Sequence, residues 1–371
     1  MLTPIAEAAY AERELFALGS ESLRRYPAFV AELERATGLP TGFRPTGTLQ
    51  VAYDHDDLDV LDELRILQDS FGVRTTPLTA RECREAEPML DPSVRGGLLA
   101  AADGSVDPRL LARALLCAAT AAGARHLPVA VAAIASRAGR AAGALLADGT
   151  QVAAPQVVLA AGWESGSLAG LPAADVPPVR PVKGQIIRLH GTAATAAAGP
   201  PGLLHRTVRG IVRGTSVYLV PRDSGELVIG ATQEEMGADT TVTAGGVWAL
   251  LRDARSIVPG ITELALTDAV AGLRPGTPDN APVLGPASLP GLVLATGHFR
   301  AGVLLAPVTA DTIAAYLHTG QQDRLWAAFR PGRFLTGRSR TGQQAGPPAE
   351  RTAATAEPAS RQGAGGQGAR S

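Results

Sequence analysis

One stretch, LVLATGHFRAGVLLAPVTADTIAAYL over residues 292–317, constrains the fold more than any other part of the chain. Its first five residues form an apolar run that predicts a buried strand, Gly297 stops the strand, and a helical pattern follows from about Ala301. A strand, a tight turn and a helix in this order are typical of an α/β fold. The start of the helix would present free N–H groups, which favour a bound anion. An ordinary βα unit with a surface arginine, Arg300, would have the same sequence pattern. The stretch alone therefore does not identify a site.

A second stretch, AGLRPGTPDNAPVLGP over residues 271–286, strengthens the case for an anion site. It places Arg274 between apolar residues and turn residues, close in sequence to Arg300. An arginine binds a carboxylate through two parallel hydrogen bonds. Two arginines at neighbouring strand ends therefore predict a pocket for a carboxylate or another anion.

Composition and charge exclude several classes of protein. The 371 residues carry a formal net charge of −1, which argues against nucleic-acid binding by bulk charge. Cys83 and Cys117 form no CxxC, and the six histidines form no HxH or HExxH, so neither a disulfide scaffold nor a metal enzyme is expected. We see no long apolar run and no signal peptide, so we expect no membrane association and a cytoplasmic protein.

The periodicity of apolar residues predicts a mixture of helices and strands. A capping box opens a helix at Thr79, Asp107 and Pro108 start another, and Pro27 is expected to break or kink the first long helix. Other helices are expected at residues 5–36, 55–71 and 243–258. Strands are expected at 47–53, 96–102, 129–134, 144–146, 157–161, 180–189, 205–212, 216–221, 226–231 and 263–273, with 157–161 buried and those from 180 to 231 in an antiparallel sheet.

The familiar catalytic motifs do not occur. We find no GxSxG, no GxxxxGK[ST] and no GxGxxG in the sequence. The acidic pairs Asp56-Asp57 and Glu234-Glu235 are interpreted as solvated, as are three arginines of the antiparallel sheet, namely Arg206, Arg209 and Arg213. The residues alone lead to an anion-binding α/β protein with candidate arginines, a tyrosine (Tyr218) on a neighbouring strand, and a helix start aimed at a ligand.

Five short motifs occur in an order and at spacings that resemble a known family. They are VKGQ (182–185), YLVP (218–221), VIGAT (228–232), AGLRPG (271–276) and GHFRAG (297–302). Together they resemble the D-amino-acid-oxidase superfamily of flavoproteins, and most closely the glycine oxidases of thiamine biosynthesis. The resemblance covers about residues 1–334.

The resemblance implies an α/β (α+β) fold in which an FAD-binding domain is interleaved with a substrate domain built on an antiparallel sheet. On this basis residues 1–95 and 179–270 belong to the substrate domain, residues 96–178 and 271–334 to the FAD-binding domain, and residues 335–371 form a disordered tail. The implied reaction is the oxidation of glycine or another small amine to an imine, which hydrolyses to glyoxylate and ammonia while O₂ becomes H₂O₂. The implied cofactor is FAD, and the implied assembly is a homotetramer.

The resemblance also assigns residues. Arg274 matches the arginine that pairs with the substrate carboxylate, Arg300 a second arginine that contacts the substrate, and Tyr218 a tyrosine that lines the pocket; these three are the catalytic candidates. The positions that match the flavin-binding loop are His298, Phe299, Arg300, Ala301, Gly302, Val303 and Leu304. Val131 matches a position whose backbone contacts the adenine side of FAD. Since the cofactor carries the chemistry, such a site needs no acid–base pair of side chains.

The sequence departs from the family at its start. Family members begin with a strand, a GxGxxG turn and a helix, whereas residues 1–4 here resemble the segment that follows that unit. We therefore expect the first βαβ unit to be absent, through a start codon assigned too late or a truly truncated chain. In either case we expect this chain to hold FAD poorly and to expose apolar surface where a strand would pair. Ala301 and Gln233 also differ from common family residues and leave the substrate preference open.

Of three alternatives, two stay open. The resemblance implies that a sarcosine oxidase would need a cysteine in the C-terminal half, and none follows Cys117, which argues against that alternative. A D-amino-acid dehydrogenase would use an acceptor other than O₂. A non-catalytic protein unable to hold FAD is the alternative from a different class.

Overall fold

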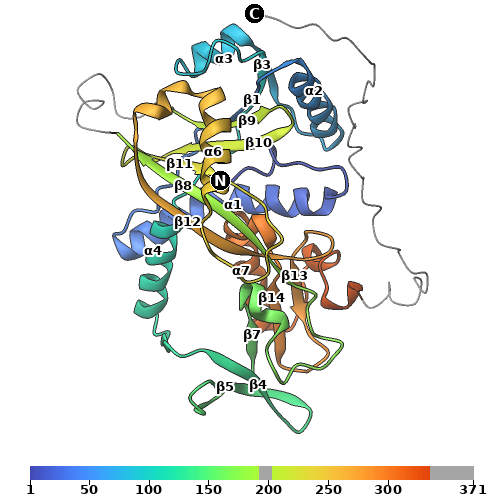
Figure 1. Cartoon of the computed structure of the whole chain (residues 1–371). Coiled ribbons are helices and arrows are strands. Elements are labelled where there is room, and N and C mark those ends of the chain that lie inside the picture. The colour runs from blue at the N-terminus through green and yellow to red at the C-terminus, as the bar shows by residue number, and fades with distance from the viewer. Residues whose placement is uncertain (192–202, 335–371) are drawn as a thin grey trace, which may run out of the picture. The chain divides into compact units, whose positions relative to one another are not determined.

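A computed structural model describes residues 1–191 and 203–334, which include every residue assigned to the site above. The expected disordered tail, 335–371, lies outside the described residues. Residues 1–333 belong to one compact unit, which contains a large sheet, two small sheets and several helices (Figure 1).

The large sheet has eight strands, and every neighbouring pair is antiparallel except β1 and β9, which run parallel. In spatial order its strands are β12 (Ala265–Gly276), β8 (Arg180–His190), β11 (Glu226–Gly230), β10 (Thr215–Pro221), β9 (Thr207–Val212), β1 (Thr48–Ala52), β3 (Gly96–Ala100) and β2 (Thr76–Thr79). The predicted antiparallel sheet is therefore confirmed. The long strands β8 and β12 pair along their whole length and run down toward the small sheets (Figure 1).

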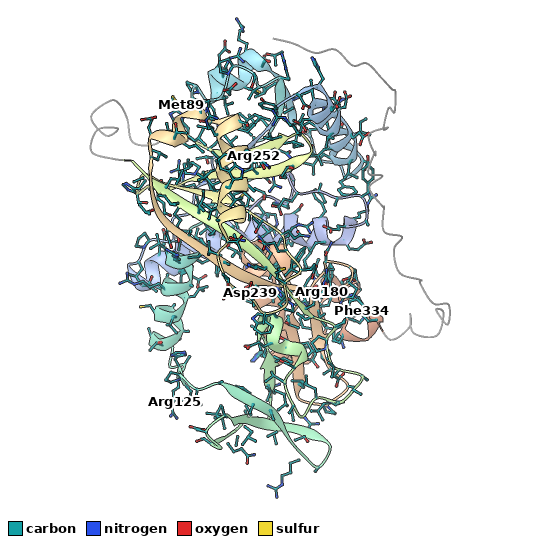
Figure 2. The ribbon with its side chains drawn as sticks, viewed as in Figure 1. Met89, Arg125, Arg180, Asp239, Arg252 and Phe334 are labelled. Atoms are coloured by element: carbon teal, nitrogen blue, oxygen red, sulfur yellow. The ribbon has the colours of Figure 1, made fainter. Side chains whose placement is uncertain are left out.

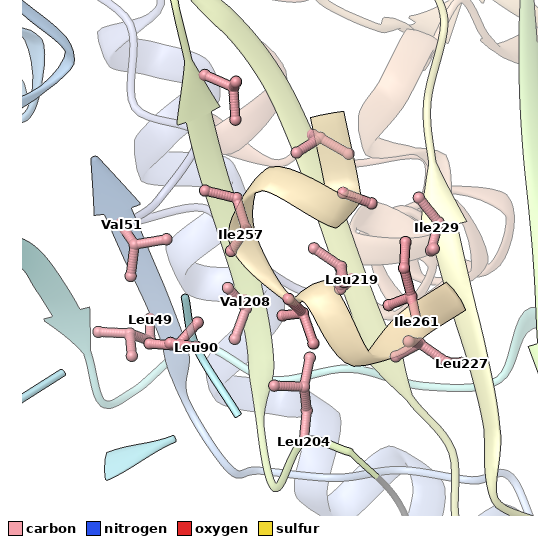
Figure 3. Close-up of a cluster of buried hydrophobic side chains, with 14 of the residues drawn as sticks. Leu49, Val51, Leu90, Leu204, Val208, Leu219, Leu227, Ile229, Ile257 and Ile261 are labelled. Carbon is pink, nitrogen blue, oxygen red and sulfur yellow. The ribbon is translucent and has the colours of Figure 1, made fainter. Parts of the chain in front are cut away.

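The main core lies between this sheet and α6 (Ala244–Ile257), which covers one of its faces. Ile257 and Ile261 meet Val208 and Leu219 of the sheet, all buried (Figure 3). Burying aliphatic side chains contributes roughly 25 cal/mol per Å² of apolar surface, so this packing is a principal source of the stability of the large sheet.

The remaining described elements are two small sheets, five further α-helices and short 3₁₀ turns. The two small sheets have three strands each, in the orders β13–β14–β7 and β4–β5–β6. Their strands are β13 (Val283–Pro286), β14 (Leu292–Thr296), β7 (Val157–Leu159), β4 (Val131–Arg137), β5 (Arg140–Leu146) and β6 (Gln151–Ala153). The other α-helices are α1 (Arg13–Thr37), α2 (His55–Ser70), α3 (Ala80–Ala86), α4 (Pro108–Ala121) and α7 (Gly302–Thr319). Short 3₁₀ turns cover Gly162–Gly166 (η1), Pro259–Glu263 (η2), Phe299–Ala301 (η3), Arg324–Trp326 (η4) and Pro331–Phe334 (η5).

Helix α7 packs inside the protein. By length and composition alone, Phe299–Thr319 could cross a membrane. However, Leu305 and Val308 are buried in a cluster with Leu18 of α1, and the hydroxyl groups of Ser22 and Tyr26 on α1 donate to carbonyls in the first turn of α7. These contacts are those of a core helix, which passes the same length and composition test.

The long first helix differs from its prediction in two respects, the residue at which it begins and its course at Pro27. It begins at Arg13 rather than at residue 5, because the buried Asp103 side chain accepts the backbone N–H groups of Ile5 and Ala6, which lie in a turn over residues 4–7. The helix also continues through Pro27, where a break or kink was expected. Pro27 is exposed, so water can satisfy the carbonyl that the missing N–H group leaves free.

The prediction of a fully buried strand near 157–161 is wrong. Strand β7 spans Val157–Leu159 and pairs only with β14 among the described strands, so it forms an edge of its sheet. Leu159 is buried, but Val158 is 38% exposed. The apolar run therefore marks an edge strand with one face open.

The division into domain segments stays a prediction. Two of its boundaries do not coincide with breaks between the sheets: β3, which starts the segment 96–178, belongs to the large sheet, and β12 runs on past residue 270 to Gly276 within that sheet.

Asp57 was expected to be solvated, and the structure corrects this. Its carboxylate is buried and accepts the backbone N–H groups of Arg213 at 2.9 Å and Gly214 at 2.8 Å, in the turn between β9 and β10. It also completes a capping box with Asp54 at the start of α2. One carboxylate thus joins a helix start to a strand turn.

We predict that Asp57→Ala lowers the free energy of unfolding by about 3 kcal/mol, because buried N–H groups lose a charged acceptor. Urea denaturation measures this change. The matched control is Asp56→Ala, which removes the exposed neighbouring carboxylate and should cost less than about 1 kcal/mol. Equal losses in the two variants would contradict the role assigned to Asp57.

Candidate functional site

The strand–turn–helix unit predicted from residues 292–317 is confirmed. Strand β14 ends at Thr296, η3 forms the turn, and α7 begins at Gly302. Gly297 has φ +70°, and a Cβ there would lie 2.6 Å from the side chain of Thr277, so the turn requires glycine. Among the described residues no side chain caps α7 at its first residue, so the N–H groups of its first turn have no side-chain acceptor.

A cavity of about 440 Å³ lies beside this turn. Its walls come from β7, β14, the turn and one face of α7, and most of the lining residues are small or apolar. Those with the smallest side chains are Ala160, Gly162, Ala295, Gly297, Gly302, Ala306 and Ala310. Such walls fit the flat apolar ring system of a flavin, and the start of α7 fits the negative charge that a reduced flavin carries.

His298 lies on the wall of this cavity. Its Nε2 atom is 3.1 Å from the hydroxyl oxygen of Thr309 on α7. Burial lowers the pKa of His298 to about 4, so the imidazole is neutral at pH 7. A neutral ring beside the cavity adds no charge to compete with the start of α7.

The depressed pKa of His298 predicts a loss of stability in acid. Between pH 6.5 and pH 4 the unfolded chain binds a proton at this histidine that the folded chain does not bind, so stability is complete above pH 6.5 and falls with pH. At pH 5 we expect His298 to cost about 1 to 2 kcal/mol. Urea denaturation of the protein and of His298→Gln at pH 7.5 and pH 5.0 tests this, since the variant should lose less stability. A variant that loses as much as the parent would show that His298 titrates normally.

Arg274 lies on β12, and its guanidinium group packs against the backbone of Gly184 on β8. A Cβ at Gly184 would lie 2.2 Å from Nη1 of Arg274, so only glycine leaves this space. Arg274 Nη1 donates to the carbonyl oxygen of Thr232 at 3.1 Å, and the carbonyl oxygen of Lys183 lies at 3.4 Å. Among the described residues, no carboxylate forms an ion pair with Arg274, in contrast to the other arginines near it.

A network of polar side chains fixes the loop that carries Thr232. Lys183 is fully buried and forms ion pairs with Asp239 at 3.1 Å and Glu234 at 3.5 Å. Burial opposes the charge on Lys183, but the two carboxylates raise its pKa. Asp239 lies near the lower ends of β8 and β12 (Figure 2). Glu234, expected to be solvated, is half-buried in this network, which holds Thr232 in place to accept from Arg274.

Tyr218 lies on β10, and its ring covers Gly230 of β11, where a Cβ would lie 2.3 Å from the phenol oxygen. Burial raises the pKa of Tyr218, although Arg274 opposes the shift, so the phenol stays neutral and can donate a hydrogen bond. Glu7 and Arg209 also act on this phenol electrostatically. Gly230, which the Tyr218 ring covers, lies two residues before Thr232, which accepts from Arg274, and β11 pairs with β8, on which Arg274 packs. The structure therefore places Tyr218 and Arg274 over neighbouring strands of the sheet.

Arg300 is linked to the same region by two glutamates, Glu7 and Glu12. Its guanidinium group forms an ion pair with Glu12, and its Nε atom lies 3.5 Å from Oε2 of Glu7. The backbone of η3 and α7 that follows it, up to Leu304, forms the turn beside the cavity. The role of Arg300 as a direct substrate contact stays a prediction, because both of its partners are protein carboxylates.

Val131, assigned to the adenine side of FAD, starts β4 and is 39% exposed. Strand β4 lies at the far end of the small sheets from the large sheet (Figure 1). The structure does not bring Val131 together with Arg274 or Tyr218, and its contact with the adenine stays a prediction.

The structure adds residues that sequence reasoning missed. Arg209, interpreted as solvated, is only 17% exposed and donates to Glu7 at 2.6 Å. Arg206 is likewise half-buried and paired with the buried Glu87 at 3.0 Å. The partners lie far away in the sequence, 202 residues apart for Arg209 and Glu7. No local pattern could therefore have paired them.

Comparison with known proteins gives a consistent result. The family model "FAD dependent oxidoreductase" (DAO) matches residues 2–316. The "Bifunctional protein ThiO/ThiG" of Synechocystis sp. is 35% identical over 91% of this chain and 47% of that protein. "Hydrogen cyanide synthase subunit HcnC" of Pseudomonas aeruginosa is 30% identical over 86% of this chain and 74% of that protein. The crystal structure of glycine oxidase from Geobacillus kaustophilus superposes with a TM-score of 0.78 at 31% identity, covering 90% of this chain and 86% of that one.

The chain spans about half the length of the ThiO/ThiG proteins that it matches. The predicted absence of the GxGxxG unit and the predicted weak binding of FAD both stay predictions.

Proposed function

Because the chain belongs to the family of FAD-dependent oxidoreductases (DAO), we propose that it oxidises glycine or another small amino acid at the carbon next to the carboxylate. The observation that carries this proposal is Arg274, a cation without a carboxylate partner among the described residues, next to a neutral phenol. The similarity to a glycine oxidase structure supports it.

The side chains of this site would bind and orient the substrate. Arg274 would hold the substrate carboxylate by two hydrogen bonds, and the phenol of Tyr218 would donate a third. Fixing the carboxylate limits the positions open to the neighbouring carbon, which lowers the entropic barrier to reaction. Of the predicted flavin-binding residues 298–304, His298 and Gly302 line the cavity and would contact the isoalloxazine ring of FAD. The role of the other five stays a prediction.

When bound, FAD supplies the acceptor for the hydride that leaves the substrate carbon. The free N–H groups of α7 would stabilise negative charge at the edge of the cavity. The small apolar side chains around it would exclude water. The net reaction proposed for glycine takes up O₂ and water and gives glyoxylate, ammonia and H₂O₂.

The test uses purified protein with added FAD. Anaerobic glycine should bleach the flavin spectrum, and air should then restore the colour with one H₂O₂ formed per glyoxylate. Bleaching without reoxidation by air would favour a dehydrogenase that uses another acceptor. No bleaching by glycine, sarcosine or D-alanine with bound FAD would contradict the proposal.

Three wider expectations belong to the same proposal. The similarity to ThiO/ThiG proteins supports a role in thiamine biosynthesis. A homotetramer, which the family resemblance implies, and a cytoplasmic location belong to the same proposal.

A further inference from the structure

Four charged side chains meet at the edge of the substrate site, and they form two compensated pairs. Glu7 accepts from Arg209 at 2.6 Å and lies 3.5 Å from Arg300, while Glu12 pairs with Arg300. Two cations and two carboxylates thus cancel. Glu12 is also held by the side chain of Asn280 at 3.1 Å, whereas both partners of Glu7 are arginines.

This cluster is next to the proposed substrate site. Arg209 lies directly opposite Tyr218 in the register of β9 and β10. The charges of Glu7, Arg209 and Arg274 all act on the Tyr218 phenol. A substrate carboxylate on Arg274 therefore has Arg209 and Glu7 as near neighbours.

Glu7 is the carboxylate that contacts both Arg209 and Arg300. With Glu12 and Arg300 it also lines a small cavity of about 30 Å³, which borders the segment before α1 and the start of α7. A second carboxylate of a substrate could reach Arg209 or Arg300 only by displacing Glu7. A substrate with one carboxylate needs only Arg274, which has no such competitor among the described residues.

We propose that Glu7 determines substrate specificity: its carboxylate occupies Arg209 and Arg300 and so restricts the site to amino acids with a single carboxylate. The inference rests on the proposed function, because it takes Arg274 as the group that binds the substrate. A dicarboxylate meets repulsion from Glu7, whereas removal of this charge opens a second anion position on Arg209 and Arg300.

Calorimetric titration with acetate, malonate and succinate, in the presence of saturating FAD, tests the inference without turnover. The parent protein should bind acetate at least as tightly as either dicarboxylate. Glu7→Gln keeps the size of the side chain and should tighten the better dicarboxylate at least tenfold, while acetate affinity changes less than threefold. The matched control Glu32→Gln removes an exposed carboxylate of α1 and should change neither.

A second variant identifies the group that is freed. In Glu7→Gln/Arg209→Gln the gain for the dicarboxylate should fall to less than threefold, because the released cation is gone. If Glu7→Gln does not fold, Glu7→Asp draws the carboxylate back by one methylene group and should give a smaller change in the same direction.

The outcomes separate the two ideas. Equal gains for acetate and dicarboxylates, or no gain, would overturn the specificity role of Glu7 while leaving acetate binding, and with it the proposed function, intact. Failure of the parent protein to bind acetate at all would overturn both. Activity with glycine is measured separately by anaerobic bleaching of the flavin.

Discussion

Replacing Arg274 with glutamine should lower kcat/KM for the amino acid substrate about a thousandfold. Two charge-assisted hydrogen bonds to a carboxylate are worth about 4 kcal/mol, and each 1.4 kcal/mol corresponds to roughly a factor of ten. Arg274→Lys keeps the charge but loses the planar fork, so its loss should be smaller, about a hundredfold.

Steady-state assays with saturating FAD measure these effects, and the visible spectrum reports whether flavin still binds. The matched control is Arg255→Gln, which removes the same charge from an exposed position on α6 and should leave kcat/KM unchanged. A loss below tenfold in Arg274→Gln would show that another group binds the carboxylate.

Gly184→Ala should produce a similar defect without touching the arginine. The added methyl group would lie 2.2 Å from Nη1 and 2.4 Å from Cζ of Arg274, so the guanidinium group must move. Because it is the free end of a flexible side chain, the fold can accommodate the shift, but the hydrogen bond to Thr232 and the orientation toward the substrate are lost. We expect kcat/KM to fall about a hundredfold and the melting temperature to change by only a few degrees.

Gly272→Ala is the control for this change. It adds the same methyl group on β12, two residues before Arg274, at a position with no atom within 4 Å. This variant should change neither kcat/KM nor the melting temperature appreciably. In the double variant Gly184→Ala/Arg274→Gln, the loss should not exceed that of Arg274→Gln alone, since both changes remove one interaction. Additive losses would mean that Gly184 serves another purpose.

The local elements were accessible to sequence reasoning because their signals are local. The capping boxes at Thr79 and the helix start at Asp107 are satisfied by atoms two or three residues away. The turn after β14 needs a glycine with positive φ, and Gly297 provides it. The five motifs indicated the family that the comparison then confirmed.

Other features were decided only by residues that meet in space. Helix α1 starts late because Asp103, nearly a hundred residues away in the sequence, binds residues 5 and 6. Asp57 is buried because it holds a turn more than 150 residues further along the chain. The local sequence around an acidic residue does not distinguish a side chain that faces water from one that binds an N–H group far along the chain.

The substrate site divides in the same way. The strand–turn–helix unit and the candidates Arg274, Arg300 and Tyr218 followed from the sequence. The folded structure was needed to see that Arg274 has no carboxylate partner among the described residues, while Glu7 and Glu12 compensate Arg209 and Arg300. The charge available to a ligand depends on which opposite charges lie within a few ångströms, and that is fixed by folding rather than by order along the chain.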